Sequence, residues 1–259
     1  MSGAWEFWID RGGTFTDIVA LNPKGRVQVH KLLSDNPERY KDAAVQGIRE
    51  LMAVSGRFGE NSIRAVKMGT TVATNALLER KGERVLLLIT RGYGDLLRIG
   101  YQTRPRLFDL HIKRQEMLYE EVSELDERLD ANGDVLLPLD EEAARSTLQG
   151  AHDKGIRAVA IAGLHAYLNP VHELRAAEIA AETGFTQISV SHRASMLAKL
   201  VGRGDTTVVD AYLSPILRNY VDQVAGELDL GRACRSLLFM QSSGGLTDAQ
   251  LFQGKDAIL

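Results

Sequence analysis

The sequence predicts an α/β fold, in which strands and helices alternate along most of the 259 residues. Residues 85–90 and 158–164 are nearly uninterrupted apolar runs, which are typical of parallel strands covered by helices on both faces. Between such runs the apolar residues recur at helical spacing, flanked by residues that start and stop helices. The sequence contains no internal repeat of solenoid length. We therefore expect layers of helices and sheet rather than a repeat array.

The chain is predicted to begin with three strands. Trp5, Phe7 and Ile9 alternate with Glu6 and Trp8, which indicates a strand of period two with one apolar face. Gly12 and Gly13 then form a turn into a returning strand, and residues 26–32 alternate again. The sequence therefore predicts a hairpin with a third strand beside it.

Helices and further strands follow in alternation. Pro37 precedes a helical apolar rhythm and is expected to open the first helix, because proline is favoured at the first helical position. Residues 64–68 are predicted as a short strand, and residues 72–80 as a helix that Gly82 terminates. We expect this helix to begin directly where the strand ends.

The pattern loosens between residues 102 and 138, where the chain is polar and rich in Arg and Glu. We interpret this stretch as an arm or β insertion. Regular structure resumes with Asp140 as the N-cap of a helix that runs to about Lys154, and acidic residues in its first turn complement the helix dipole.

The last third is again predicted to alternate. Pro170 opens a helix that Gly184 closes, and residues 187–191 are strand-like. A long helix follows, kinked at Pro215. Residues 237–240 are expected to be the final strand, followed by a glycine-rich turn and one more helix.

The composition is that of an ordinary globular protein, with 44% hydrophobic and 25% charged residues. The net charge of −3 supplies no basic field, so no nucleic-acid partner is expected. No apolar run reaches the roughly 20 residues of a membrane span and no signal segment is recognised, which predicts a cytoplasmic protein without membrane contact. The single cysteine, Cys234, excludes an internal disulfide and a Cys-rich zinc site.

The paired glycines of the first turn carry the strongest chemical signal. Glycine can adopt positive φ, which would let successive N–H groups point into one concavity that binds phosphate. Asp10, at the end of the first strand, could hold Mg²⁺ through water, because Mg²⁺ keeps most of its hydration. An ordinary tight hairpin fits the same spacing, and spacing alone favours that alternative.

Residues 10–17, Asp-Arg-Gly-Gly-Thr-Phe-Thr-Asp, resemble the first phosphate loop of the actin, Hsp70 and sugar-kinase ATPase superfamily. The resemblance implies that Asp10 positions Mg²⁺-bound water and that Asp10 and Thr14 are catalytic. It also implies a set of nucleotide-binding residues: Arg11, Gly12, Gly13, Thr14 and Thr16.

Several further blocks, taken in order, resemble the N-terminal portion of the hydantoinase A and 5-oxoprolinase family. They are residues 68–82, 107–110, 126–128, 169–173, 206–213 and 240–245. Residues 31–34, Asn36, Pro37, Tyr40 and residues 119–122 are more similar to the 5-oxoprolinase branch. The resemblance implies a ribonuclease H-like ATPase lobe with a β-rich insertion and the start of a second lobe.

The resemblance covers only the opening portion of the family's proteins. Their second glycine-rich phosphate loop and a later Ser-Gly-Pro-Ala-Gly-Gly block are not in this sequence. We therefore expect a first lobe at residues 1–204, with its arm at about 102–138, and a truncated second lobe at 205–259. The remaining lobes would come from the same polypeptide or a partner subunit, and the complete protein is expected to form a homo-oligomer.

The implied activity is ATP-dependent hydrolysis of a cyclic amide, with ATP and Mg²⁺ as cofactors. The expected substrate is 5-oxo-L-proline, opened to L-glutamate as ATP becomes ADP and phosphate, and the chain alone is expected to be inactive. An ATP-dependent hydantoinase or an acetone-carboxylase-type subunit is an alternative. A lobe that binds nucleotide or a partner without chemistry is another.

Two more clusters are candidates for substrate or phosphate contact. The first lies where a strand meets a helix and contains Gly69, Thr70, Thr71 and Asn75. The second, expected in a similar position, contains Ser242, Ser243, Gly244 and Gly245. A plain threonine cap and a plain glycine turn are the respective alternatives. Arginines 98, 104 and 106 could neutralise an anionic substrate, or lie in solvent or a subunit contact.

Overall fold

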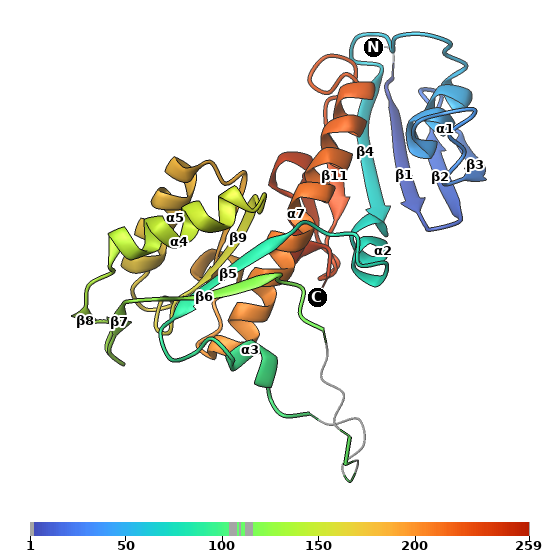
Figure 1. Cartoon of the computed structure of the whole chain (residues 1–259). Coiled ribbons are helices and arrows are strands. Elements are labelled where there is room, and N and C mark those ends of the chain that lie inside the picture. The colour runs from blue at the N-terminus through green and yellow to red at the C-terminus, as the bar shows by residue number, and fades with distance from the viewer. Residues whose placement is uncertain (1–2, 104–107, 109, 112–115, 259) are drawn as a thin grey trace. The chain divides into compact units, whose positions relative to one another are not determined.

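The computed structural model describes residues 3–103, 108, 110–111 and 116–258 (Figure 1). The chain divides into two compact units. Unit 1 combines Met1–Lys81 with Ile216–Leu259, and unit 2 is Gly82–Pro215. The division falls inside helix α7 (Leu200–Glu227), as does the boundary expected after residue 204. That expected boundary stays a prediction, and each unit is described by itself.

Unit 1 is built on a six-stranded sheet in the order β12-β11-β4-β1-β2-β3. Its strands are β1 (Trp5–Arg11), β2 (Phe15–Leu21), β3 (Val27–Leu33), β4 (Ile63–Thr70), β11 (Leu237–Met240) and β12 (Leu246–Asp248). Strands β1, β4 and β11 are parallel, whereas β2, β3 and β12 each run antiparallel to a neighbour. This arrangement is the one expected of a ribonuclease H-like lobe. The carboxyl ends of β1, β4 and β11 therefore share one edge of the sheet.

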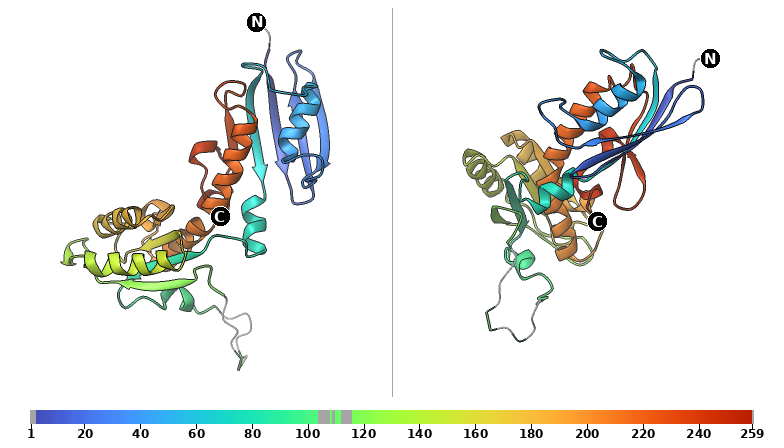
Figure 2. Two further views of the ribbon diagram at one scale, coloured as in Figure 1. Left: turned by 45° about the horizontal axis from the view of Figure 1, so that its top comes forward. Right: turned by 90° about the vertical axis from the view of Figure 1, so that its right-hand side faces the viewer.

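Helix α1 (Ala43–Met52) covers the strands that open the chain, as Figure 2 shows. Alternate side chains of β1 and β2, including Phe7 and Ile18, are buried on this face. A Cβ at Gly47 would lie 2.2 Å from Ile18 Cδ1, so helix and sheet approach too closely for a side chain there. The expectation that Pro37 opens this helix is wrong. The helix begins after Asp42, because the Asp42 carboxylate caps the Val45 N–H at 3.0 Å.

The end of the chain differs from expectation. Strand β11 is not the last strand, because β12 pairs with it antiparallel. Residues 242–245 therefore form a hairpin turn instead of a strand-to-helix junction, and Gly244 adopts a φ of 88° that favours glycine. Two short 3-10 helices, η1 (Ala249–Leu251) and η2 (Gly254–Asp256), follow.

Unit 2 is built on a parallel sheet in the order β10-β9-β5-β6. Its strands are β5 (Val85–Thr90), β6 (Glu121–Leu125), β9 (Ala158–Ala162) and β10 (Gln187–Val190). Every residue of β5 and β9 is buried, as the two apolar runs predicted. Helices α4 (Glu141–Asp153) and α5 (Val171–Thr183) lie side by side on one face (Figure 2). Asp140 and Gly184 cap them as expected.

The expected arm at 102–138 is only partly separate from the sheet. Strand β6 belongs to it in sequence but pairs in parallel with β5. Strands β7 (Arg128–Leu129) and β8 (Val135–Leu137) form a small sheet of their own. Arg104 and Arg106, proposed as anion contacts, and part of the 107–110 block lie outside the described residues.

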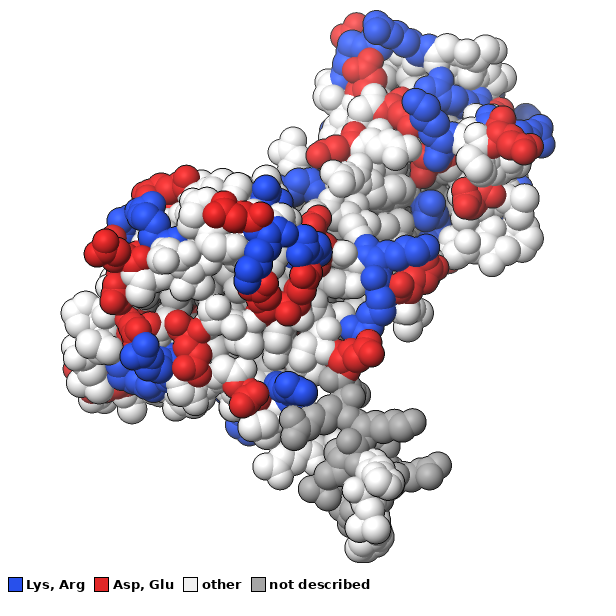
Figure 3. Space-filling model, viewed as in Figure 1, with Lys and Arg blue, Asp and Glu red and all other residues white. Residues whose placement is uncertain are grey.

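The remaining helices of unit 2 are α3 (Leu96–Ile99), α6 (Ser191–Ala194) and the first part of α7. A Cβ at Gly82 would lie 2.0 Å from the Tyr212 ring, so the chain passes very close to α7 just before β5. Among the described residues, no helix has the length and apolar character to cross a membrane. Basic and acidic side chains are intermixed over the described part of the face drawn in Figure 3.

Candidate functional site

The three predicted clusters lie at the carboxyl edge of the unit 1 sheet. Asp10 pairs with Gly69, and Arg11 with Thr70, where the parallel strands β1 and β4 end. Strand β11 ends on the other side of β4 and leads into the 242–245 turn. In open α/β sheets, ligands bind outside the carboxyl ends of the strands. The topology therefore brings the clusters to the edge where a ligand is expected.

The glycine turn leaves two main-chain donors unused. The Gly12 N–H donates to the Phe15 carbonyl at 3.0 Å and closes the hairpin. Within the described residues, the N–H groups of Gly13 and Thr14 have no acceptor. Gly13 and Thr14 are both exposed, so these donors are available to a ligand.

Close packing, and not positive φ, accounts for glycine at position 12, whereas a Cβ at Gly13 would make only an ordinary van der Waals contact. Neither Gly12 nor Gly13 has positive φ, so the nest of left-handed glycines expected from the sequence is wrong. A Cβ at Gly12 would lie 3.0 Å from the Phe15 carbonyl oxygen, and one at Gly13 would lie 3.4 Å from Asn75 Nδ2. The turn is therefore bare of side chains and has an amide group beside it.

The start of helix α2 (Val72–Leu78) is tied to the end of β1. The N–H of Thr71 donates to the Arg11 carbonyl at 3.2 Å, and its hydroxyl donates to the same oxygen at 3.3 Å. The Asn75 side-chain amide donates to Thr71 Oγ1 at 3.4 Å. Thr71 is thus engaged in positioning the helix, whereas Asn75 lies next to the Gly13 turn.

Asp10 presents an exposed carboxylate at the end of β1. Gly69 beside it has no side chain, and a Cβ there would lie 3.7 Å from Asp10 Oδ1. Asp17 is its partner on β2, where Lys31 Nζ neutralises it at 2.8 Å. The described residues contain no group of three or more His, Cys, Asp or Glu side chains able to hold a metal. A single free carboxylate fits a hydrated Mg²⁺ and does not fit zinc.

The side chains of Arg11 and Thr16 support the turn from the interior. The Arg11 guanidinium lies 5.1 Å from the Tyr220 ring centroid, and its Nε is 3.6 Å from the Asp42 carboxylate. Burial, reinforced by the nearby Asp42 carboxylate, raises the pKa of Tyr220, so the phenol stays protonated. Thr16 is fully buried and its Oγ1 lies 2.9 Å from Ser34 Oγ. The burial of Thr16 argues against the direct nucleotide contact expected of it. The Arg11 side chain is 20% exposed and its Nε has no hydrogen-bond partner among the described residues, so its expected nucleotide contact stays a prediction.

Two of the four N–H groups of the 242–245 turn are used in hydrogen bonds. The Ser242 N–H donates to the Asp256 carbonyl at 2.9 Å, and the Gly244 N–H donates to the Gln241 carbonyl at 2.9 Å. The hydroxyls of Ser242 and Ser243 lie on exposed residues. The N–H groups of Ser243 and Gly245 have no acceptor among the described residues, so they and the serine side chains are available to a ligand.

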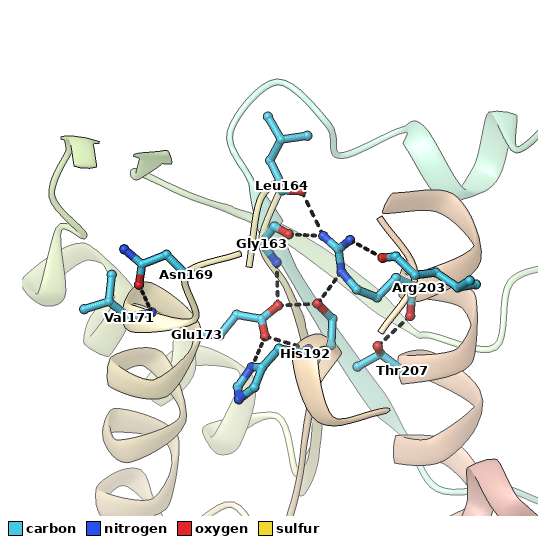
Figure 4. Close-up of polar contacts among 10 residues, drawn as sticks. Gly163, Leu164, Asn169, Val171, Glu173, His192, Arg203 and Thr207 are labelled. Carbon is cyan, nitrogen blue, oxygen red and sulfur yellow. Dashed lines mark hydrogen bonds and ion pairs between the residues drawn. The ribbon is translucent and has the colours of Figure 1, made fainter. Parts of the chain in front are cut away.

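A second polar cluster, which the sequence did not reveal, lies at the carboxyl edge of the unit 2 sheet (Figure 4). Arg203 is fully buried and donates to the carbonyls of Gly163 and Leu164 and to Ser191 Oγ. Its guanidinium also donates to the carbonyls of residues 197 and 198. Burial lowers the pKa of Arg203. The cluster joins the end of β9, the α6 region and α7.

Glu173, on α5, occupies the centre of this cluster. Its carboxylate accepts from the Gly163 N–H at 2.7 Å, from Ser191 Oγ, and from the His192 N–H and Nδ1 at 3.1 and 2.6 Å. Next to it, His172 Nδ1 lies 2.6 Å from the buried Glu127 carboxylate. These groups satisfy one another, so the cluster is a structural network. The only sequence signal for it was the His172-Glu173 pair beside a helix start.

Comparison with known proteins identifies the family. The chain belongs to the hydantoinase/oxoprolinase family, because the model of the hydantoinase/oxoprolinase N-terminal region matches residues 6–184. A second hydantoinase/oxoprolinase model matches residues 203–259. The family resemblance inferred from the sequence blocks is thereby confirmed.

Related proteins are much longer than this chain. "5-oxoprolinase 1" of Arabidopsis thaliana is 40% identical over 100% of this chain and 23% of its own length. The crystal structure of the ATP-dependent caprolactamase from Pseudomonas jessenii matches with a TM-score of 0.81 and 29% identity, covering 98% of this chain and 38% of that chain. Nucleotide-free acetone carboxylase matches with a TM-score of 0.79 and 21% identity, over 99% and 38%, which shows a shared fold. The chain thus spans less than a quarter of the plant relative.

Proposed function

We propose that this chain supplies the first phosphate-binding turn of an ATP-dependent enzyme that hydrolyses a cyclic amide. The observation that carries the proposal is the pair of unused N–H groups at Gly13 and Thr14, beside the free Asp10 carboxylate. Main-chain donors and one carboxylate are what a Mg²⁺-nucleotide requires. The names of the plant relative and of the caprolactamase support ATP use and amide hydrolysis.

The residues of the turn would position phosphate instead of reacting with it. The N–H groups of Gly13 and Thr14 would donate to phosphate oxygens, and the Thr14 hydroxyl would add a donor. Asp10 would orient water held by Mg²⁺, and the ion would supply charge neutralisation for the transferring phosphoryl group. Phosphoryl transfer depends mainly on positioning and electrostatic stabilisation, so this set is sufficient for the first lobe of such a site.

The substrate we propose is 5-oxo-L-proline. Transfer of the γ-phosphoryl group to the lactam carbonyl oxygen makes the ring carbon electrophilic. One water adds to that carbon, the ring C–N bond breaks, and a second water releases phosphate, which leaves L-glutamate, ADP and phosphate. Hydantoins and other lactams would react by the same steps. Because the chain spans 23% of its plant relative, we expect it to bind nucleotide weakly and to turn over none by itself.

Titration calorimetry with Mg-ADP tests whether the chain binds nucleotide, and the full-length protein tests turnover. Asp10→Asn should abolish 5-oxoproline-dependent ADP release with the fold intact. Asp17→Asn is the matched control, because it removes a carboxylate on the neighbouring strand that Lys31 already neutralises. Near-normal turnover by Asp10→Asn would remove Asp10 from the site. A panel of 5-oxoproline, hydantoin and caprolactam decides the substrate.

A further inference from the structure

Ser34, just after β3, binds the glycine turn from its inner side. Its hydroxyl donates to the Gly12 carbonyl at 2.7 Å, and its N–H donates to the Thr14 carbonyl at 2.9 Å. The residue is only 4% exposed, so solvent does not compete for these bonds. One buried residue thus holds carbonyl oxygens on both sides of Gly13.

The direction of each hydroxyl follows from proton counting. A serine hydroxyl has one proton, and Ser34 gives it to the Gly12 carbonyl. The contact of 2.9 Å between Thr16 Oγ1 and Ser34 Oγ must therefore be donated by Thr16. The result is a chain of two hydroxyls that ends on the Gly12 carbonyl, in which each bond polarises the next.

The bond to Gly12 sets the orientation of the neighbouring donor. In a trans peptide the C=O and N–H of one plane point in opposite directions, and the structure contains no cis peptide among its described residues. Holding the Gly12 carbonyl toward Ser34 therefore turns the Gly13 N–H away from the core. Without that bond the peptide between two glycines could rotate and present its carbonyl to an anion, because neither residue has a Cβ.

We propose that Ser34 is a positioning residue, whose hydroxyl aims the Gly13 N–H at the nucleotide phosphate. The inference rests on the proposed function, because it assigns a residue that prepares the same turn. Ser34 itself touches no phosphate, since it lies on the carbonyl side of the turn.

The two hydroxyls provide a matched pair of variants. Ser34→Ala removes the bond to the Gly12 carbonyl, whereas Thr16→Val leaves Ser34 free to make it. We expect Ser34→Ala to weaken Mg-ADP binding by about tenfold, the size of effect that one lost polar contact produces. Thr16→Val should change it by less than about twofold. Ser34→Thr keeps the hydroxyl and should retain most of the affinity.

Calorimetry on the chain measures the affinity, and NMR of the Gly13 amide measures the turn without ligand. The Gly13 amide shift and exchange rate should change in Ser34→Ala and stay close to wild type in Thr16→Val, with circular dichroism checking the fold. Equal losses of affinity in both variants, or an unchanged Gly13 amide in Ser34→Ala, would overturn the inference. If wild type binds no Mg-ADP, the proposed nucleotide site fails in this chain, and the amide signals still decide whether Ser34 orients the turn.

Discussion

The carboxyl edges of the two sheets contain similar kinds of polar residue, but these residues have free hydrogen-bonding groups in unit 1 and are buried and fully hydrogen-bonded in unit 2. In unit 1, the Gly13 and Thr14 N–H groups and the Asp10 carboxylate have no partner among the described residues. In unit 2, Glu173 and Arg203 are buried and fully bonded to neighbouring strands and helices. The richer polar cluster is therefore the structural one, and the sparser edge is the candidate site.

The difference follows from the cost of burying polar groups. An unpaired buried charge is strongly destabilising, so a cluster inside a fold must satisfy itself. Donors at an exposed turn can bond water until a ligand replaces it, and so can remain free. Available hydrogen-bonding capacity identifies a site better than the number of polar residues does.

The largest effect on stability is expected from Arg203→Met in the unit 2 cluster. The change leaves the Gly163 and Leu164 carbonyls and Ser191 Oγ without their donor. We expect a loss of about 3–5 kcal/mol in unfolding free energy, the range for removing one partner of a buried charged network. Urea denaturation followed by circular dichroism measures it. Lys199→Ala, an exposed change one turn away, is the control, and equal losses in both would contradict a structural role for the cluster.

A smaller loss is expected from Glu173→Gln. Glutamine has the same size and shape as glutamate, but an NH₂ group replaces one of the two carboxylate oxygens. This donor would face either the Gly163 N–H or the His192 donors, and that hydrogen bond would be lost. We expect about 2–3 kcal/mol, as for hydrogen bonds to a charged group. Glu178→Gln on the same helix is exposed and should cost less than about 0.5 kcal/mol. A Glu173→Gln protein as stable as wild type would show that the network is dispensable.

How far the sequence could predict these regions depends on the range of the interactions. Strands β5 and β9 were predictable because each is a continuous apolar run, and α4 because Asp140 caps it. Strand β6 was not, because three of its five residues are polar and its apolar residues, Val122 and Leu125, are three apart, so neither an apolar run nor strict alternation marks it. Its pairing to β5 is set by the tertiary fold.

The same limit applies to the site. The Gly12-Gly13 turn and Asp10 are adjacent in sequence and were recognisable as a motif. The role of Ser34 depends on contacts across the β2–β3 pairing, and that of Arg203 on contacts with residues 163 and 164. Pro37 misled the prediction because a local helix-start signal was overridden by the Asp42 cap.

A third test uses Cys234, a fully buried polar group of unit 1 that lies near the beginning of β4, away from the candidate site. Burial raises the pKa of its thiol to about 11. Above about pH 8.5 the thiol of the unfolded chain loses its proton, whereas the thiol of the folded protein keeps it. The contribution of Cys234 to the unfolding free energy is therefore fully present below about pH 8.5 and is lost as the pH rises toward 11.

We expect wild type to lose about 2 kcal/mol more than Cys234→Ala between pH 8 and pH 10. Urea midpoints at the two pH values measure the difference. If both proteins lose the same unfolding free energy, the thiol has the same pKa in the folded and unfolded states. Burial in unit 1 would then not prevent a polar group from exchanging its proton with solvent.

The smallest effect on stability is expected from Gly13→Ala. The same variant tests most directly whether the free N–H groups at the carboxyl edge of the unit 1 sheet bind phosphate. Gly13 does not have positive φ, so alanine is compatible with the backbone, and its methyl group would lie 3.4 Å from Asn75 Nδ2. Stability should change by less than about 0.5 kcal/mol. The methyl group would nevertheless occupy the space beside the free N–H, and Mg-ADP affinity should fall by about tenfold or more. Gly56→Ala, where a Cβ meets nothing within 4 Å, controls for the gain of a methyl group. If Gly13→Ala binds Mg-ADP as wild type does, the free donors of this turn are not the phosphate site. Free hydrogen-bonding groups at the unit 1 edge would then not mark a binding site.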